Sequence, residues 1–335
     1  MKVLVLGGTH HVGRAVVEAA LVRGDKVTTL NRGISGVPVA GVEEIFADRM
    51  NRDAVSKAIG DRTWDAVIDT WAWEPRVVQD TVELLADRVN HYGYVSRRGV
   101  YQWPWPSNAD ENAPLVNGNP FSENSENYAE AKRGCEISVI NTFKENALIA
   151  RSGMILGPYE DVGRIPWWMR RLERNGRVLA PGPVDTPLQY IDAHDLALWM
   201  LSCAERDVGG TFNVACEPHF TTVGELLYTI KDVIGSDTEL VWADPDLLER
   251  EDFMLGMEFG LRYPGLPKPS GLHDDNVTAA HQAGLTIRPL RKTLAETWKW
   301  LYDEGNPKPR PDSPSLDSLI DPAKEKIVIN KITQF

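Results

Sequence analysis

A glycine-rich segment near the N-terminus constrains the fold more than any other part of the chain. Residues 2–6 (KVLVL) form a short apolar run rich in β-formers, residues 7–13 read GGTHHVG, and a helical pattern follows Gly13. A glycine-rich turn from a strand into a helix lets backbone N–H groups approach a diphosphate, which then lies at the positive end of the helix. The alternative is a tight turn that needs glycine only for its backbone dihedral angles. The segment therefore predicts a bound dinucleotide.

The overall composition indicates a globular protein whose partner is a small molecule. The chain has 335 residues, 42% of them hydrophobic and 25% charged, which suits one large or two modest domains. Its formal net charge of −12 argues against nucleic acid and anionic membranes as partners. The three cysteines show no metal-site spacing and indicate a reducing compartment. No apolar run approaches the roughly 18 residues that span a bilayer, and no signal peptide is recognised, so we expect a cytoplasmic protein without a metal.

Strand and helix patterns alternate through the first half of the chain. The expected strands after the first are residues 26–30, 43–47, 65–69, 91–96 and 147–151. Such alternation predicts an α/β fold in which a Rossmann-type, doubly wound parallel sheet carries helices on both faces. Sheets of this kind bind ligands beyond the carboxyl ends of their strands, so we expect the functional residues in the loops that follow the strands.

The second half is less regular and predicts a smaller C-terminal lobe. We expect a dinucleotide-binding domain over residues 1–155 with returns near 190–215, a mainly substrate-binding lobe over 156–300, and an extended tail over 305–335. Within the lobe, a helix is expected over 222–233 with Thr221 or Thr222 as its N-cap. A second helix is expected over 294–302 with Thr293 as its N-cap.

Tyr128 and Lys132 form the candidate catalytic pair. Their four-residue spacing puts both side chains on one face of a helix. An ammonium beside a phenol stabilises the phenolate and lowers the pKa of the tyrosine, which can then exchange a proton with a carbonyl or alcohol oxygen. The lysine can also reach a ribose hydroxyl. The alternative is a solvated helix face, but the position of the pair between two strands of a dinucleotide-binding pattern favours catalysis.

These features together resemble the extended, or atypical, short-chain dehydrogenases/reductases, the group that includes NAD-dependent epimerases and dehydratases. The resemblance covers roughly residues 1–300 and rests on the segments 7–13, 48–49, 95–101, 128–132, 157–158 and 189–196. It implies a Rossmann-type domain that holds NAD or NADP and a C-terminal lobe that clamps the substrate. Tyr128 would be the acid/base, Lys132 its activator, and Asp48 a contact of the adenine. The resemblance is also compatible with a homodimer.

Departures from the family pattern bear on the cofactor. His10 replaces the middle glycine of the turn, and it and His11 either help to hold phosphate or only pack. After the second strand, NAD-preferring members carry an acidic residue for the ribose, whereas this chain has Asn31 and Arg32. A guanidinium suits a 2′-phosphate, with Arg14 as a second donor, so NADP(H) is the preferred cofactor and NAD(H) the alternative. The predicted cofactor contacts are Gly7, Thr9, His10, His11, Val12, Gly13, Asn31, Arg32, Asp48, Arg49, Thr70, Trp71 and Lys132.

Other departures bear on the chemistry. The family's catalytic hydroxyl follows the fifth strand, where this chain has Arg97, with Ser96 one residue early. Either Ser96 substitutes after a local shift, or Arg97 polarises the carbonyl; Arg97 could equally anchor an anionic substrate group or pair with an acid at the surface. Dehydratases carry Thr-Asp-Glu where this chain has residues 97–99 (RRG), which argues against dehydration. Met154 replaces an asparagine that binds the substrate diphosphate, which argues against a sugar nucleotide.

Tryptophans gather on the expected loops and in the lobe. Large aromatic rings favour a flat or bulky apolar substrate, although they fill cores more often than they line pockets. The predicted substrate contacts are Trp73, Trp103, Met154, Trp167 and Trp168.

The sequence therefore predicts an NADP(H)-dependent ketoreductase or dehydrogenase that acts on a medium-sized cyclic or aromatic metabolite. In this hypothesis Tyr128 is the acid/base, and Ser96 or Arg97 steadies the developing oxyanion. The first alternative is an NAD-dependent sugar or nucleotide-sugar epimerase, which uses the same tyrosine. The second is a non-catalytic relative that binds a dinucleotide or RNA, against which the net charge and the intact Tyr128/Lys132 pair argue.

Overall fold

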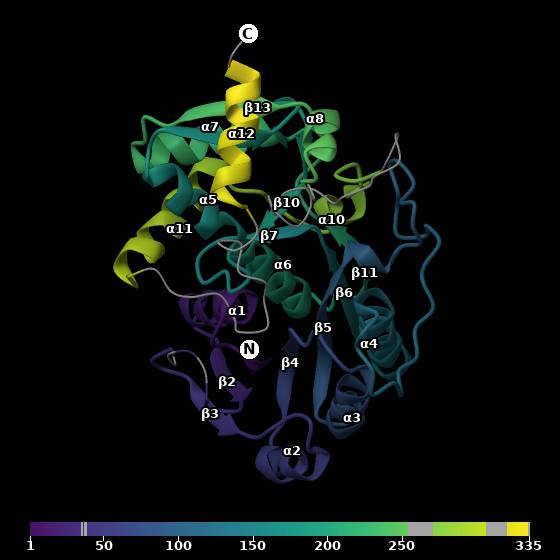
Figure 1. The fold of residues 1–335 in the computed structure, drawn as a ribbon. Helices are drawn as coiled ribbons and strands as arrows, with labels where there is room; N and C mark the ends of the chain where they lie inside the picture. The colour runs from purple at the N-terminus through teal and green to yellow at the C-terminus, as the bar shows by residue number, and fades with distance from the viewer. Residues whose placement is uncertain (35, 37–38, 254–270, 306–319, 334–335) are drawn as a thin grey trace. The chain divides into compact units, whose positions relative to one another are not determined.

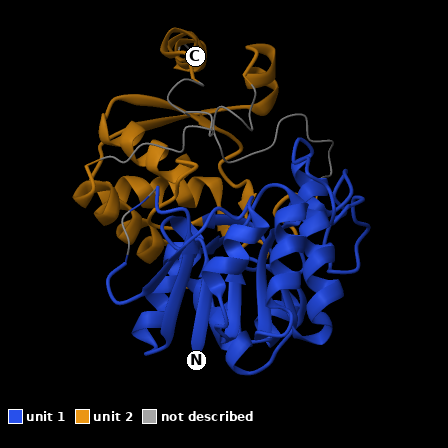
Figure 2. Ribbon diagram, turned by 90° about the horizontal axis from the view of Figure 1, so that it is seen from below, with its two compact units in different colours: residues 1–155, 190–217, 275–287 blue, residues 156–189, 218–274, 288–335 orange. Residues whose placement is uncertain are grey.

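The computed structural model describes residues 1–34, 36, 39–253, 271–305 and 320–333 (Figure 1). The chain divides into two compact units (Figure 2). Unit 1 consists of residues 1–155, 190–217 and 275–287, and unit 2 of residues 156–189, 218–274 and 288–335. The first boundary falls at residue 155, where the predicted dinucleotide-binding domain ends. Among the described residues, no helix has both the length and the apolar character needed to cross a membrane.

Unit 1 is built around a seven-stranded sheet in the order β11-β6-β5-β4-β1-β2-β3. All neighbouring strands in it are parallel. The strands are β1 Lys2–Leu6, β2 Lys26–Asn31, β3 Glu43–Phe46, β4 Trp64–Asp69, β5 Val89–Arg97, β6 Ala147–Ser152 and β11 Gly210–Val214. The predicted Rossmann-type doubly wound sheet is thus confirmed.

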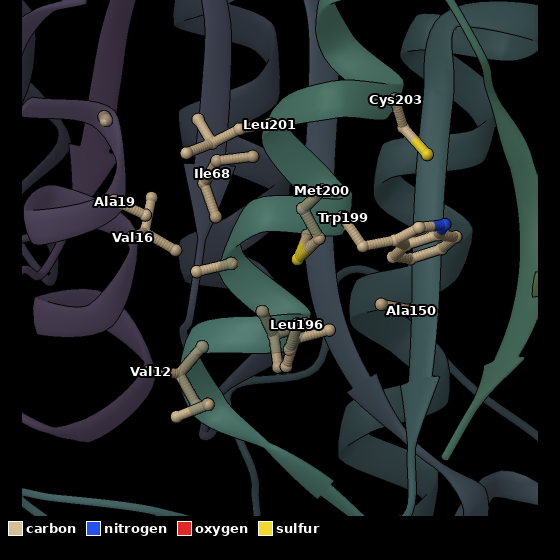
Figure 3. Packing of buried hydrophobic residues seen from close by; sticks show 14 of the residues in the cluster. Val12, Val16, Ala19, Ile68, Ala150, Leu196, Trp199, Met200, Leu201 and Cys203 are labelled. Atoms are coloured by element: carbon tan, nitrogen blue, oxygen red, sulfur yellow. The ribbon is translucent and has the colours of Figure 1, made fainter. Parts of the chain in front are cut away.

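Helices cover both faces of this sheet because successive strand residues point to opposite sides. The helices of unit 1 are α1 His11–Val22, α2 Arg52–Ile59, α3 Pro75–Leu85, α4 Tyr128–Phe143, α6 Ala193–Glu205 and α10 Thr278–Gln282, with the 3₁₀ turns η1 Arg98–Val100 and η2 Lys144–Asn146. Val3 and Val5 of β1 face a buried cluster with α1 and α6, which contains Val16, Leu196 and Met200 (Figure 3). The alternate residues of β1 face a second cluster with α2, α3 and α4.

Unit 2 contains smaller sheets and helices. Its elements are α5 Arg164–Glu173, β8 Arg177–Pro181, β9 Pro187–Leu188, β12 Thr221–Thr222, α7 Val223–Ile234, β13 Glu239–Ala243, α8 Pro245–Arg250, α11 Leu290–Asp303 and α12 Pro322–Thr333. Strands β8 and β13 pair in parallel, and β9 and β12 pair antiparallel. Strand β7 Met154–Leu156, which crosses the unit boundary, pairs with β10 Tyr190–Asp192. Helix α7 begins with a capping box in which Thr222 and Glu225 satisfy each other's backbone N–H groups, so Thr222 is the cap among the two that the sequence left open.

Two predictions for the C-terminal region are wrong. Helix α11 begins at Leu290, one turn before the predicted start, and Thr293 is a fully buried residue of the helix rather than its cap. The predicted extended tail contains helix α12, whose Val328 and Ile329 are buried, while its residues 306–319 lie outside the described part of the chain. Glu325 of α12 accepts a hydrogen bond from the backbone of Leu179 in β8. Because the segment near residue 310 is rich in proline and charge, the helical pattern that follows it was not recognised in the sequence.

Candidate active site

The turn between β1 and α1 is closely packed around its glycines. Gly7 and Gly8 have φ values of +118° and +105°, a region that L side chains rarely adopt. A Cβ on Gly13 would lie 2.7 Å from the backbone nitrogen of Gly8, so only glycine lets α1 start so close to β1. His10, the N-cap residue of α1, makes no side-chain capping bond, and the first turn contains no acidic residue. This backbone is suited to a diphosphate at a helix N-terminus.

The other predicted residues of this turn take part in different ways. Val12 is buried in the core shared by α1 and α6, so only its backbone can contact a ligand. Thr9 packs against Gly36, where an added Cβ would lie 2.6 Å from the Cβ of Thr9. His11 has a φ of +35° and is half-buried.

The carboxyl ends of β2 and β3 carry two exposed side chains, Arg32 and Phe46. Arg32 follows β2 and is exposed, and the side chain of Asn31 accepts a hydrogen bond from the N–H of Gly33. The ring of Phe46, 58% exposed, lies against Gly33, where a Cβ would be 2.9 Å from it. Asp48 is exposed and accepts a hydrogen bond from the N–H of residue 50.

Arg49 and Asp69 form a buried ion pair at the ends of β3 and β4. Both guanidinium nitrogens Nη1 and Nη2 donate to the carboxylate, at 2.7 and 2.9 Å. Tyr92 and the backbone of Trp71 donate to the same carboxylate. Burial alone would raise the pKa of Asp69, but the charge of Arg49 and these hydrogen bonds together lower it. The guanidinium of Arg49, a predicted cofactor contact, is thus enclosed by protein, and its Cζ lies 5.1 Å from the ring centre of Trp71.

The segment after β4 links this pair to Lys132. The hydroxyl of Thr70 donates to the carbonyl of Leu6 at the end of β1. The carbonyl of Trp71 accepts hydrogen bonds from Lys132 at 2.8 Å and from the hydroxyl of Tyr94 at 2.9 Å. Lys132 also donates to the carbonyl of Val95 at 2.6 Å. Two of the three ammonium protons of Lys132 are thus bound by backbone, which leaves the third for a ligand.

Lys132 is a buried amine in an apolar setting. It is 3% exposed, and its Nζ lies 4.3 Å from the ring centre of Tyr94. Burial lowers the pKa of Lys132 to about 8, with a smaller contribution in the same direction from the charge of Arg97.

Tyr128 begins α4 and is half-buried among side chains from two other segments. The Cζ of Arg97, at the end of β5, lies 4.7 Å from the centre of the Tyr128 ring. The ring of Trp73, in the segment between β4 and α3, lies 6.1 Å from the same ring at an angle of 52°. The structure thus brings together three predicted residues, an acid/base candidate, a cation and an aromatic ring, all within unit 1.

Part of the chain matches a known family at the level of sequence. Residues 3–95 match the model described as the NAD dependent epimerase/dehydratase family. A search of curated proteins finds no match to this sequence. The resemblance to the extended short-chain dehydrogenases/reductases is confirmed. The match over residues 3–95 agrees with the expectation of an NAD(P)-dependent enzyme of this type.

Solved structures of such enzymes share the fold. The Bordetella bronchiseptica enzyme WbmH, in complex with NAD+, has a TM-score of 0.69 at 16% identity, over 91% of this chain and 99% of that chain. The UDP-glucose 4-epimerase of Thermotoga maritima, with UDP-glucose, has a TM-score of 0.68 at 17% identity, over 91% and 100%. The UDP-glucose 4-epimerase of Thermus thermophilus, with NAD, has a TM-score of 0.63 at 18% identity, over 90% and 99%. At such identities the likeness shows the fold alone.

The position of the family's catalytic hydroxyl is where this chain departs most clearly from the short-chain dehydrogenase/reductase pattern. Ser96 is 3% exposed, and its hydroxyl donates to Glu136 of α4 at 2.6 Å. Arg97 instead lies over Tyr128. Between the two residues that the sequence left open, this geometry favours Arg97.

Glu136 and Arg151 were missed by sequence reasoning. The Glu136 carboxylate is fully buried and accepts from Ser96, from Arg133 and, at 3.0 Å each, from two nitrogens of Arg151. Arg151 also donates to the hydroxyl of Tyr101. Glu136 follows Lys132 by four residues, and this spacing, which puts it on the same helix face, is the signal that would have found it. The network holds the end of β5 against α4.

The predicted substrate-contacting tryptophans divide between surface and interior. Trp103 is 49% exposed and packs edge-on against Trp105 at 5.0 Å. In unit 2, Trp167 and Trp168 of α5 pack on each other and are 8% and 0% exposed, which corresponds to the core-filling alternative. Met154, in β7, is half-buried.

The low pKa of Lys132 should make stability depend on pH. Between about pH 8 and the ordinary lysine pKa of 10.5, the unfolded chain holds more protons on this lysine than the folded one, so stability rises with pH in that window. From about pH 7 to about pH 9.5, wild type should gain about 1–2 kcal/mol of unfolding free energy relative to Lys132→Met. Urea unfolding at both pH values measures this, with Lys57→Met on the exposed face of α2 as the control. A constant difference between wild type and Lys132→Met would contradict it.

Proposed function

We propose that this protein is an NADP(H)-dependent oxidoreductase, of ketoreductase or dehydrogenase type, that acts on the carbonyl or alcohol of a medium-sized cyclic or aromatic metabolite. The observation that carries this proposal is the half-buried Tyr128 beside Arg97 and Trp73, on the same helix as the buried Lys132. The glycine turn lies in the same unit and is suited to a dinucleotide, because Gly7, Gly8 and Gly13 lack the Cβ atoms that would crowd its backbone.

Some residues of this chain would bind the cofactor, and Tyr128 would transfer the proton. A nicotinamide dinucleotide, when bound, supplies the hydride donor or acceptor. The turn over residues 7–13 would hold its diphosphate, and Lys132 would use its third N–H on a ribose hydroxyl. Tyr128 would give a proton from its hydroxyl to the carbonyl oxygen in reduction, and take it back in oxidation. Trp73 offers an apolar face to a flat substrate.

Arg32 supports the preference for NADP(H). Its guanidinium follows β2, where a 2′-phosphate would be bound, and no acidic residue stands beside it in the sequence. Arg32→Ala should weaken NADPH binding by about 10- to 100-fold, because a charge-assisted contact of roughly 1.5–3 kcal/mol is lost. NADH binding should stay nearly the same, since NADH has no 2′-phosphate.

Tryptophan fluorescence titration with each nucleotide measures this. Arg62→Ala is the matched control, because this substitution removes the same charge at a distant position. Arg62 pairs with Glu43 at the opposite end of β3. Equal losses for both nucleotides, or none for either, would count against a 2′-phosphate contact at Arg32.

An NAD-dependent epimerase is the second candidate function. Structural neighbours include UDP-glucose 4-epimerases, and the Tyr128/Lys132 pair would serve an epimerase as well. Met154, in place of an asparagine, weakens this candidate because a thioether cannot donate to a diphosphate.

Identification of the nucleotide that the protein binds tests both candidates. The purified protein is denatured and any released nucleotide is identified, and protein without nucleotide is titrated with NADPH and NADH. An empty protein that binds NADPH more tightly than NADH supports the reductase. Stoichiometric NAD that does not exchange supports the epimerase and contradicts the role of Arg32. Binding of neither nucleotide contradicts both candidates.

A further inference from the structure

Gly99 makes room for the side chain of Arg97. A Cβ on Gly99 would lie 2.5, 2.6 and 2.7 Å from Nε, Cζ and Nη2 of Arg97. The backbone of Gly99 is not among those with positive φ, so its conformation does not itself require glycine. An added Cβ would displace the guanidinium that lies directly over Gly99. Arg97 and Gly99 therefore act as a pair: Gly99 leaves the space that the guanidinium of Arg97 fills.

The space that Gly99 leaves places the guanidinium on the face of Tyr128. The Cζ of Arg97 is 4.7 Å from the centre of the ring, and both residues are half-buried. A cation over an aromatic face is attracted to the ring electrons. The attraction is stronger for a phenolate, whose negative charge spreads into the ring, so this position favours the ionised form of Tyr128.

Lys132 is less suited to this task than its spacing suggests. Two of its protons are bound by the carbonyls of Trp71 and Val95, and it faces the ring of Tyr94. Its pKa of about 8 means that its charge is lost just above neutral pH, whereas a guanidinium keeps its charge throughout.

We propose that Arg97, admitted by Gly99, is the cation that stabilises the phenolate of Tyr128, a task that the family resemblance assigns to Lys132. Arg97 acts through Tyr128 and is a positioning residue in this role. Titratable groups near Tyr128 in the described part of the chain include Arg97 and Tyr94 from β5, and Glu130 and Lys132 follow it on its own helix. Among these, Arg97 lies directly over the ring face. The catalytic importance of this phenolate rests on the proposed function. The ionisation of Tyr128 can be tested independently of that function.

Ultraviolet titration of tyrosinate tests this without substrate or cofactor. Buried Tyr92 and Tyr94 have pKa values well above the usual range, and burial raises the pKa of Tyr101 to about 12, so these three stay protonated below about pH 10.5. Each protein is titrated with and without the additional substitution Tyr128→Phe. The difference between the two curves is the ionisation of Tyr128. Circular dichroism at each pH confirms that the chain stays folded.

Four variants separate the contributions of Arg97 and Gly99 to the midpoint of Tyr128 ionisation. Arg97→Met should raise the midpoint of Tyr128 ionisation by about one to two pH units, the size expected for a unit charge at this distance in a half-buried site. Arg97→Lys should recover part of the shift. Gly99→Ala should raise the midpoint because the added Cβ displaces the guanidinium, but should do nothing further when combined with Arg97→Met. Arg76→Met, on the exposed face of α3, removes the same charge elsewhere and should leave the midpoint unchanged.

The results that would overturn the proposal are distinct. An unchanged midpoint in Arg97→Met contradicts the role of Arg97, most clearly if Lys132→Met raises it instead. A Gly99→Ala effect that persists in the Arg97→Met background contradicts the pairing of the two residues. If the midpoint of Tyr128 ionisation shifts as expected but the protein binds no dinucleotide, the role of Arg97 is supported and the proposed function is refuted.

Discussion

Tyr128→Phe is expected to reduce kcat by about 10²- to 10⁴-fold with the protein's substrate, while NADPH binding is retained. The phenol is the group that exchanges a proton with the reacting oxygen, and general acid–base catalysis contributes an effect of this size. Phenylalanine keeps the ring that packs against Arg97 and Trp73, so the local structure should persist. The loss should appear in kcat and kcat/KM alike, since the proton moves only on the way to the transition state.

Steady-state kinetics and nucleotide titration on the same preparation measure this effect. Tyr302→Phe is the matched control, because Tyr302 is 73% exposed in unit 2 and loses the same hydroxyl. Full turnover by Tyr128→Phe would remove this residue from the acid/base role. A loss of nucleotide binding together with turnover would assign Tyr128 to cofactor binding instead.

Asp69→Asn is expected to lower the free energy of unfolding by about 3–5 kcal/mol at neutral pH. The change leaves the guanidinium of Arg49 buried without its counter-charge, and also weakens the hydrogen bonds from Tyr92 and the backbone of Trp71. Because the pKa of Asp69 is lowered in the folded protein, the stabilisation is present above the unfolded carboxyl pKa of about 3.9 and is lost as the pH falls through the folded value.

Urea unfolding of the wild type and three variants tests this prediction. The double variant Arg49→Met/Asp69→Leu should recover most of the lost stability, because a buried ion pair is often replaceable by apolar groups of similar volume. Glu18→Gln breaks the partly exposed pair with Arg14 on α1 and should cost less than about 1 kcal/mol. A loss in Asp69→Asn as small as in Glu18→Gln would mean that water reaches Arg49.

The same ion pair bears on the active site through the backbone. Asp69 binds the N–H of Trp71, whose carbonyl in turn holds Lys132 and Tyr94. If the double variant is stable, its residual activity will show whether the pair also positions Lys132. Arg49 was predicted as a cofactor contact, and the structure gives its guanidinium an enclosed position beneath the Trp71 ring instead.

Local patterns were sufficient for the parallel sheet and the Tyr128/Lys132 helix. The six strands predicted in the first half of the chain match the observed ones to within two residues at either end, for example residues 91–96 for a strand that spans Val89–Arg97. Helix α12 was missed, because its pattern is short and follows a segment rich in proline and charge.

The sequence by itself determined the class of fold, the glycine turn and the residue types offered at each strand end, because these depend on periodicity and on single residues such as Gly13. Only the tertiary structure decided which of these side chains meet. Ser96 and Arg97 are neighbours in the sequence, yet one donates to buried Glu136 and the other lies over Tyr128, two residues that are eight positions apart on α4. The partners come from α4, about 30 to 40 residues further along, and no local pattern specifies contacts over that distance.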